Sequence, residues 1–164
     1  MILSKPEAEI AIDTALVRAL VAEQHPDLAL APLVDVGEGW DNRLFRLGSD
    51  LVVRLPRRAA SAELIDHELR WLPQLAPRLP LAVPAIQRAG RPGAGFPWNW
   101  SIASWVPGDP ALHVPPRDLR ATAAALGAFL RALHQSAPQD APRNPWRGVP
   151  LADRTPSFTN TSLA

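Results

Sequence analysis

The 164 residues carry a formal net charge of +1, so the sequence has no broad basic surface of the kind that binds nucleic acid or an anionic membrane. Cysteine is absent, which excludes disulfides, thiolate zinc sites and cysteine nucleophiles. No apolar run approaches the roughly 20 residues of a membrane span, and the start of the chain has no signal-peptide core. With 47% hydrophobic residues, we expect a soluble, cytoplasmic globular protein.

The predicted elements follow one another as helix, three strands, helix, two strands and helix. In chain order they are helix 14–25, strands 28–37, 41–47 and 50–55, helix 61–75, strands 84–90 and 98–106, and helix 115–135. Asp13 and Ser61 are the expected caps of the first two helices, and Pro115 or Pro116 fits the first turn of the last. Gly48 and Ser49 suit a hairpin turn. This order predicts an α+β fold with a mostly antiparallel, five-stranded sheet.

Two charged residues interrupt apolar patterns on successive elements. Glu68 lies four residues after Leu64, in the middle of the apolar stripe of helix 61–75, and Arg54 interrupts the apolar run LVVRL. Because a buried charge needs a partner of opposite sign, the two side chains can meet if the helix packs on the sheet. The arginine would then offer its remaining N–H groups to an anion. Alternatively, Arg54 reaches solvent at a strand end and Glu68 lies at the edge of the stripe.

Three segments, in this order and spacing, resemble the N-terminal lobe of aminoglycoside phosphotransferase-like kinases, the small-molecule branch of the protein-kinase-like fold. They are VDVGEGWDNRLFRLGSDLVVRLPRR, ELIDHELRWLPQLAPRLPLAVPAI and PWNWSIASWVPGDPA. The resemblance covers about residues 10–150. It implies a kinase-like nucleotide-binding lobe over 1–106, followed by a hinge and the first helix of a C-terminal lobe over 107–135. The proline-rich tail, 136–164, is expected to be poorly ordered.

The resemblance implies nucleotide-binding roles for nine residues: Gly37, Gly39, Trp40, Asn42, Arg54, Glu68, Ser104, Trp105 and Val106. The first four match the loop that covers the ATP phosphates in such kinases. Arg54 matches the third-strand lysine that holds the phosphates, and its replacement by arginine departs from the general pattern; Glu68 matches the glutamate that pairs with this cation. The last three match the hinge whose backbone binds the base. Taken alone, the glycine pair fits an ordinary hairpin turn and SWVPG a strand end.

The catalytic H-G-D-x-x-x-x-N motif of this family appears nowhere in the sequence, so we assign no catalytic and no metal-binding residue. We expect the N-terminal part of a kinase that binds ATP or GTP with Mg²⁺ and phosphorylates a small-molecule hydroxyl. Its Mg²⁺ ligands would come from a missing lobe, and this chain alone would be inactive. The alternative is a non-enzymatic nucleotide- or protein-binding fragment of a truncated gene, or a degenerate fragment without a role. A frameshift, premature stop or gene-prediction error near residue 155 would explain the change in composition there.

The last predicted helix has an apolar stripe with little sequence left to cover it. The stripe over residues 116–135 consists of Leu119, Ala123, Leu126, Leu130 and Leu133. An uncovered stripe of this kind forms a sticky patch. We therefore expect this helix to fold back on its own lobe, to self-associate or to fray.

Overall fold

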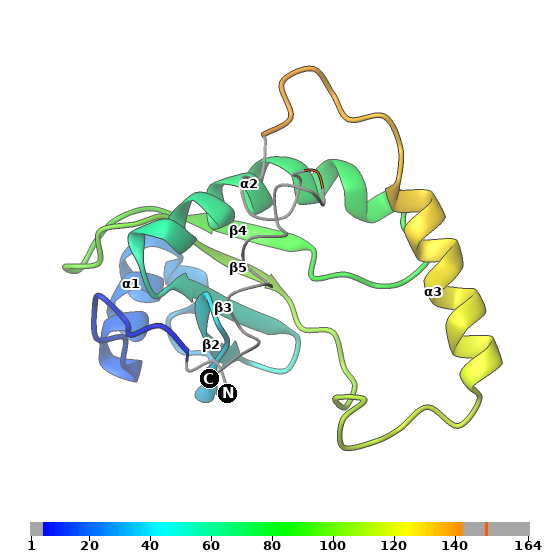
Figure 1. Cartoon of the computed structure of the whole chain (residues 1–164). Helices are drawn as coiled ribbons and strands as arrows, with labels where there is room; N and C mark the ends of the chain where they lie inside the picture. The colour runs from blue at the N-terminus through cyan, green and yellow to red at the C-terminus, as the bar shows by residue number, and fades with distance from the viewer. Residues whose placement is uncertain (1–4, 143–149, 151–164) are drawn as a thin grey trace, which may run out of the picture. The chain divides into compact units, whose positions relative to one another are not determined.

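A five-stranded antiparallel sheet forms the centre of the fold (Figure 1). The computed structural model describes residues 5–142 and 150, and its strands lie in the order β1-β2-β3-β5-β4. They are β1 (Leu33–Glu38), β2 (Asn42–Leu47), β3 (Leu51–Pro56), β4 (Ile86–Gly90) and β5 (Trp100–Ser104). Every neighbouring pair is antiparallel. The predicted fold class, α+β with a five-stranded antiparallel sheet, is confirmed.

Three α-helices and two 3-10 helices complete the described elements. They are α1 (Thr14–Gln24), η1 (Pro26–Leu28), α2 (Ala59–Leu75), η2 (Ala76–Arg78) and α3 (Leu119–Leu133). Asp13 caps α1 as predicted, because its Oδ1 accepts a hydrogen bond from the Leu16 N–H at 2.8 Å. None of the described helices is long and apolar enough to cross a membrane.

The predicted starts of the other two helices were wrong. Ser61 is a buried residue inside α2, whose N-cap is Arg58, and its hydroxyl donates to the Asp41 carboxylate at 3.1 Å instead of capping the helix. The last helix begins after Asp118, whose side chain accepts from Ala121, and so starts later than the two prolines that were expected to open it.

Three predicted strands were too long at their starts, among them the fourth, which begins at Ile86 and not at residue 84. The first begins at Leu33 and not at residue 28, because the chain around Pro26 turns through a 3-10 helix before it extends. The fifth begins at Trp100, while Trp98 lies outside the strand and packs edge-on against Phe96. Trp100 is fully buried and belongs to the core.

The two faces of the sheet carry different partners. Residues of α1 form the main core with alternate residues of β2, β3 and β5, and this cluster includes Val17, Leu20, Phe45, Val53, Leu55, Trp100 and Ile102. The other face of β3 carries Arg54, which alternates with these core residues. Because α2 contacts β3, β4 and β5 and is not part of that cluster, it covers the opposite face.

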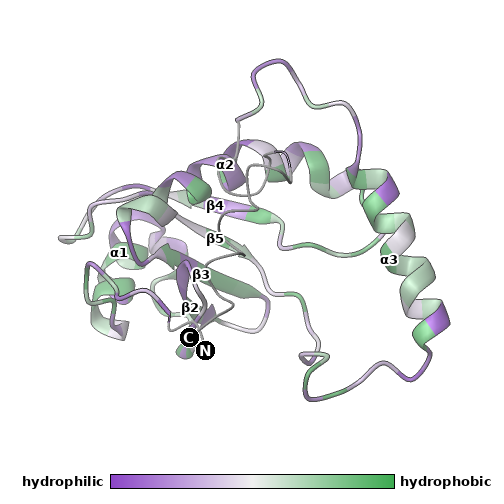
Figure 2. Ribbon diagram, viewed as in Figure 1, coloured by the Kyte–Doolittle hydropathy of each residue, from purple (hydrophilic) through white to green (hydrophobic). Residues whose placement is uncertain are grey.

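The chain divides into two units, residues 1–134 and 135–164. In the second unit only residues 135–142 and 150 are described, and they form no helix or strand. The expected disorder of the tail therefore falls mainly outside the described residues. Helix α3 ends the first unit and has no buried residue, and Figure 2 shows hydrophobic residues along much of it. Its leucines Leu119, Leu126 and Leu130 are exposed, so the predicted stripe is present on a formed helix.

Candidate functional site

A cleft of about 430 Å³ lies beside the β1–β2 loop, β3 and the end of β5. Seven of the nine residues predicted to bind nucleotide line it: Gly39, Trp40, Asn42, Arg54, Ser104, Trp105 and Val106. The two others, Gly37 and Glu68, lie outside the lining, Gly37 within β1 and Glu68 on α2. The fold thus brings residues from three separate parts of the sequence to one concave surface, which is where small-molecule sites usually lie.

Arg54 and Glu68 form an ion pair at this cleft. Nη2 of Arg54 donates to Oε1 of Glu68 at 2.9 Å, and Nη1 lies 2.6 Å from Oε2. The side chains are 17% and 27% exposed, so solvent screens the pair less than it would a surface pair. The two-point contact fixes the plane of the guanidinium while other N–H groups stay available to an anion. This ion pair agrees with the sequence, in which Arg54 and Glu68 each interrupt an apolar pattern and need a partner of opposite charge.

The loop between β1 and β2 is closed by its own backbone. Gly37 has a φ of +101°, in the left-handed region, and the register with β2 shifts next to it. Its N–H donates to Oδ1 of Asp35 at 2.8 Å. This hydrogen bond, together with the Arg43 guanidinium, lowers the pKa of the Asp35 carboxyl despite its partial burial. Two residues after Gly37, the Gly39 N–H donates to the Asn42 carbonyl at 2.8 Å, and this backbone hydrogen bond closes the loop. The chain therefore needs glycine at position 37 for its backbone conformation.

At the end of β5, the sheet itself uses most of the backbone donors that were expected to bind a base. The Ser104 N–H donates to Ala85 at 2.8 Å and the Trp105 N–H to Asp50 at 2.7 Å. Within the described part of the chain, the Val106 N–H has no acceptor. The guanidinium of Arg46 lies 4.8 Å from the centre of the Trp105 ring, which holds this indole by a cation–π contact. Val106 is consequently the backbone donor that this segment can offer to a ligand.

Two residues beside the cleft, Asp41 and Arg57, were not among the predicted site residues. Asp41 lines it, and its carboxylate accepts from Ser61 and from Arg58. Arg57 is only 5% exposed, although it stands in a run of charged and small residues that looks like a surface turn. An arginine pair directly after a strand was the sole signal, and it does not tell which guanidinium turns inward.

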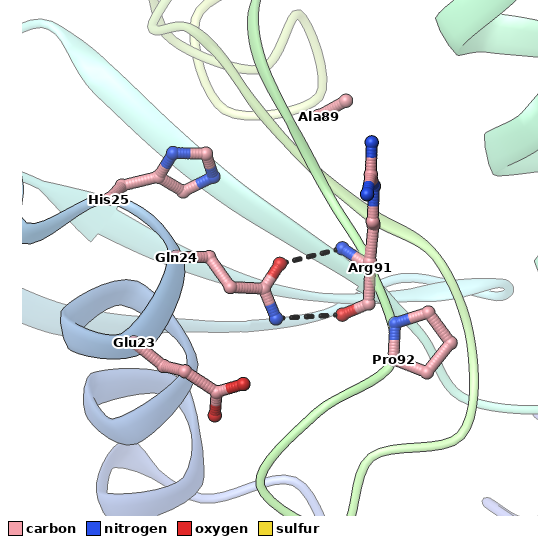
Figure 3. A pocket seen from close by; sticks show the side chains of 6 residues that line it. All are labelled: Glu23, Gln24, His25, Ala89, Arg91 and Pro92. Atoms are coloured by element: carbon pink, nitrogen blue, oxygen red, sulfur yellow. Dashed lines mark hydrogen bonds between the residues drawn. The ribbon is translucent and has the colours of Figure 1, made fainter.

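A second cavity, of about 410 Å³, lies where the end of α1 meets the segment after β4 (Figure 3). Both ends of the Gln24 amide bind the backbone of Arg91 there: the oxygen accepts from the Arg91 N–H at 2.7 Å, and the nitrogen donates to the Arg91 carbonyl at 2.9 Å. The ring of His25 packs edge-on against Trp100. Burial lowers the pKa of His25 and so does nearby Arg88, whereas Asp27 and a hydrogen bond to the Ala89 backbone raise it. None of the predicted site residues lies here, and we assign these contacts to the docking of α1.

Neither cavity contains a cluster of metal-binding side chains within the part of the chain that the structure describes. Among residues 5–142 and 150, no group of three or more His, Asp or Glu side chains is placed to hold a metal ion. The groups that line the described cleft, the Arg54 guanidinium and backbone N–H groups, suit the binding of an anionic ligand.

Comparisons with known proteins identify relatives of this architecture. A family model described as the phosphotransferase enzyme family matches residues 33–162. The GDP complex of wild-type aminoglycoside 2'-phosphotransferase-IIIa has a TM-score of 0.73 and 19% identity, over 91% of this chain and 51% of that one. An APH(2'') enzyme with GDP and kanamycin has a TM-score of 0.63 and 23% identity, over 71% and 40%. Macrolide 2'-phosphotransferase type I has a TM-score of 0.50 and 24% identity, over 93% and 48%.

The structural matches cover a larger share of this chain than of the solved structures. The chain spans about half the length, or less, of the solved structures that it matches, and no curated protein sequence matches it. At these identities the structures show the kinase-like N-lobe fold. The family model, in contrast, covers well over half of the 164 residues. The resemblance seen in the sequence is confirmed, and the chain belongs to the phosphotransferase enzyme family.

Proposed function

We propose that this chain carries the nucleotide-binding part of a small-molecule phosphotransferase. In the complete enzyme, the γ-phosphoryl group of ATP or GTP would pass to a hydroxyl group of an acceptor of the aminoglycoside class. The observation that carries the proposal is the cleft, in which Arg54, held by Glu68, lines the same surface as the β1–β2 loop and the end of β5. Three solved structures with this fold hold GDP, ATP or ADP, and two of them also hold kanamycin or streptomycin.

The residues of the cleft suit a nucleotide. Its volume lies within the roughly 300–1,000 Å³ that is usual for small-molecule sites. In our proposal Arg54 binds the phosphates through the N–H groups that Glu68 leaves available, and Glu68 keeps the guanidinium in the right plane. The Val106 N–H binds the edge of the base, and Trp40, which is half-exposed at the rim, covers the ligand.

The Mg²⁺ that accompanies nucleotides in phosphoryl transfer would neutralise charge between the β- and γ-phosphates. The residues described here do not fit a protein-held metal site, so we assign none of them to Mg²⁺ and derive no step through it. Transfer also needs a carboxylate close to the acceptor hydroxyl. We assign this role to no described residue, and we propose that residues 1–106 form the nucleotide-binding lobe and 107–135 the hinge and the first helix of the acceptor-binding lobe.

Nucleotide affinity tests the proposal directly. ATP or GTP should stabilise the protein against thermal unfolding by about 2.7 kcal/mol at a concentration of 100 times the dissociation constant. Arg54→Gln should raise that constant about tenfold or more, because one charge-assisted contact to phosphate is lost. The control is Arg18→Gln, which removes a guanidinium that donates to the Ala29 carbonyl away from the cleft. No stabilisation by any nucleotide, or equal affinities for the two variants, would refute the assignment.

A second assay separates binding from transfer. The protein is incubated with γ-labelled ATP, Mg²⁺ and an aminoglycoside, and label is sought in the aminoglycoside. Labelled acceptor would mean that this chain is itself a phosphotransferase. Nucleotide binding without labelled acceptor would support a nucleotide-binding lobe whose chemistry depends on further residues.

A further inference from the structure

Arg57 is a buried cation held against the β1–β2 loop. It follows β3 directly, and its Nε lies 3.1 Å from Oε2 of Glu38, which makes an ion pair without the alignment of a hydrogen bond. Its Nη1 donates to the carbonyl oxygens of Gly39 and Trp40, at 3.3 and 3.4 Å. Because a buried guanidinium is costly without partners, these three contacts hold the side chain and the loop together.

The backbone of Arg57 holds the same loop. Its N–H donates to the Asp41 carbonyl at 2.9 Å, and its own carbonyl accepts from the Glu9 N–H at 2.9 Å. The segment from Glu38 to Asp41 is thus attached at each residue to one junction, the start of the connection from β3 to α2. Arg57 does not line the cleft, so an effect that it exerts through contacts reaches a ligand by way of this loop.

Peptide geometry gives these contacts a consequence for the cleft. All peptide bonds of the described chain are trans, so the C=O and the N–H of one peptide unit point in opposite directions. The Gly39 carbonyl shares its unit with the Trp40 N–H, and the Trp40 carbonyl shares its unit with the Asp41 N–H. With both carbonyls on Arg57, both N–H groups point away from it.

These two N–H groups are available to a ligand. Within residues 5–142 and 150, neither the Trp40 N–H nor the Asp41 N–H has a hydrogen-bond acceptor, and both residues line the cleft. Successive backbone N–H groups that point the same way form a concave site for an anion such as phosphate.

We propose that Arg57 is a positioning residue, which turns the Gly39 and Trp40 carbonyls inward and so directs the N–H groups of Trp40 and Asp41 at a phosphate group of the bound nucleotide. This inference rests on the proposed function, because the ligand is the nucleotide of that site. It adds to that site Arg57, which does not touch the ligand. It also adds the two backbone N–H groups that Arg57 orients.

The test compares a ligand with phosphates and one without. Dissociation constants for ATP and for adenosine are measured by NMR titration with the wild type, Arg57→Gln, Arg57→Lys and the control Arg18→Gln. For Arg57→Gln the constant for ATP should rise about tenfold while that for adenosine changes less than about twofold, because only the phosphate donors lose their orientation. Arg57→Lys should lie between, since one ammonium cannot serve two carbonyls and a carboxylate together. Equal losses for ATP and adenosine, or no loss, would overturn the proposal.

A second measurement needs no nucleotide. Hydrogen exchange of the Gly39 N–H, which is bonded to the Asn42 carbonyl, reports whether the loop keeps its shape in the free protein. Exchange of this N–H should be faster in Arg57→Lys and in Glu38→Gln than in the control variant. Because Glu38→Gln leaves Arg57 in place, it can be measured even if Arg57→Gln fails to fold. Unchanged exchange in both would overturn the positioning role. If the wild type binds no nucleotide, the proposed function is refuted, and this exchange measurement still decides whether Arg57 shapes the loop.

Discussion

The ion pair between Arg54 and Glu68 should stabilise the folded chain by a measurable coupling energy. The perturbation is a double-mutant cycle with Arg54→Gln, Glu68→Gln and the double variant, each of which keeps a side chain of similar size. Each single variant leaves one charge without its partner, while the double variant leaves two neutral amides. The cycle therefore isolates the interaction between the two side chains.

The magnitude follows from the exposure of the pair. Exposed ion pairs contribute about 0.2–1 kcal/mol, and breaking a buried pair costs about 3–5 kcal/mol. The two side chains are 17% and 27% exposed and meet at two points. The free energy that is lost when this pair is broken should therefore lie between these two values. We expect each single variant to lose about 2 kcal/mol and the coupling energy to be about 1.5 kcal/mol.

Urea unfolding followed by tryptophan fluorescence measures these free energies, provided that the slope against urea concentration stays constant across the variants. The matched control is the pair Arg88–Asp27, which is 3.8 Å apart with side chains 49% and 60% exposed. Its cycle should give less than about 0.5 kcal/mol. A coupling that small for Arg54–Glu68 as well would refute the argument that the fold holds this guanidinium firmly at the cleft.

Three further predictions concern other parts of the chain. Gly90→Ala should destabilise the fold by about 3 kcal/mol in urea unfolding, because a Cβ there overlaps the buried Trp100 ring, whereas Gly127→Ala, with open space around it, should stabilise α3 by about 0.8 kcal/mol. Because the pKa of His25 is lowered in the folded state, its contribution to stability is complete above about pH 6.5 and is lost as the pH falls toward the folded-state pKa. The wild type should therefore lose more stability than His25→Gln between pH 7 and pH 5, and parallel losses would contradict this. If the exposed face of α3 self-associates, sedimentation should depend on protein concentration in the wild type and not in Leu126→Glu, and a wild type that stays monomeric would rule it out.

The order of the elements could be read from the sequence because each depends on residues close together in the chain. Periods of two and of about 3.6 residues, with turn residues between them, identified every described strand and α-helix. The Arg54–Glu68 pair was also within reach, because each charge interrupts an apolar pattern on one of two successive elements and needs a partner. The predicted limits were wrong at the starts of β1 and α3, where the sequence pattern does not distinguish a strand or a helix from a 3-10 turn or a loop.

The details of the cleft, in contrast, depend on contacts between residues far apart in the sequence. Ser61 fits a helix cap equally well in the sequence, and it is the carboxylate of Asp41, 20 residues earlier, that takes its hydroxyl. Likewise, Arg57 and Arg58 are equivalent as neighbouring letters, and Arg57 becomes the buried one because the carbonyls of a loop 17 and 18 residues earlier meet it. Among the residues that the structure describes, the strand register on both sides of β5 leaves the Val106 N–H without an acceptor while the N–H groups of Ser104 and Trp105 are engaged. A pattern along the chain carries no information about such partners, because packing brings them together only when the sheet and α2 have formed.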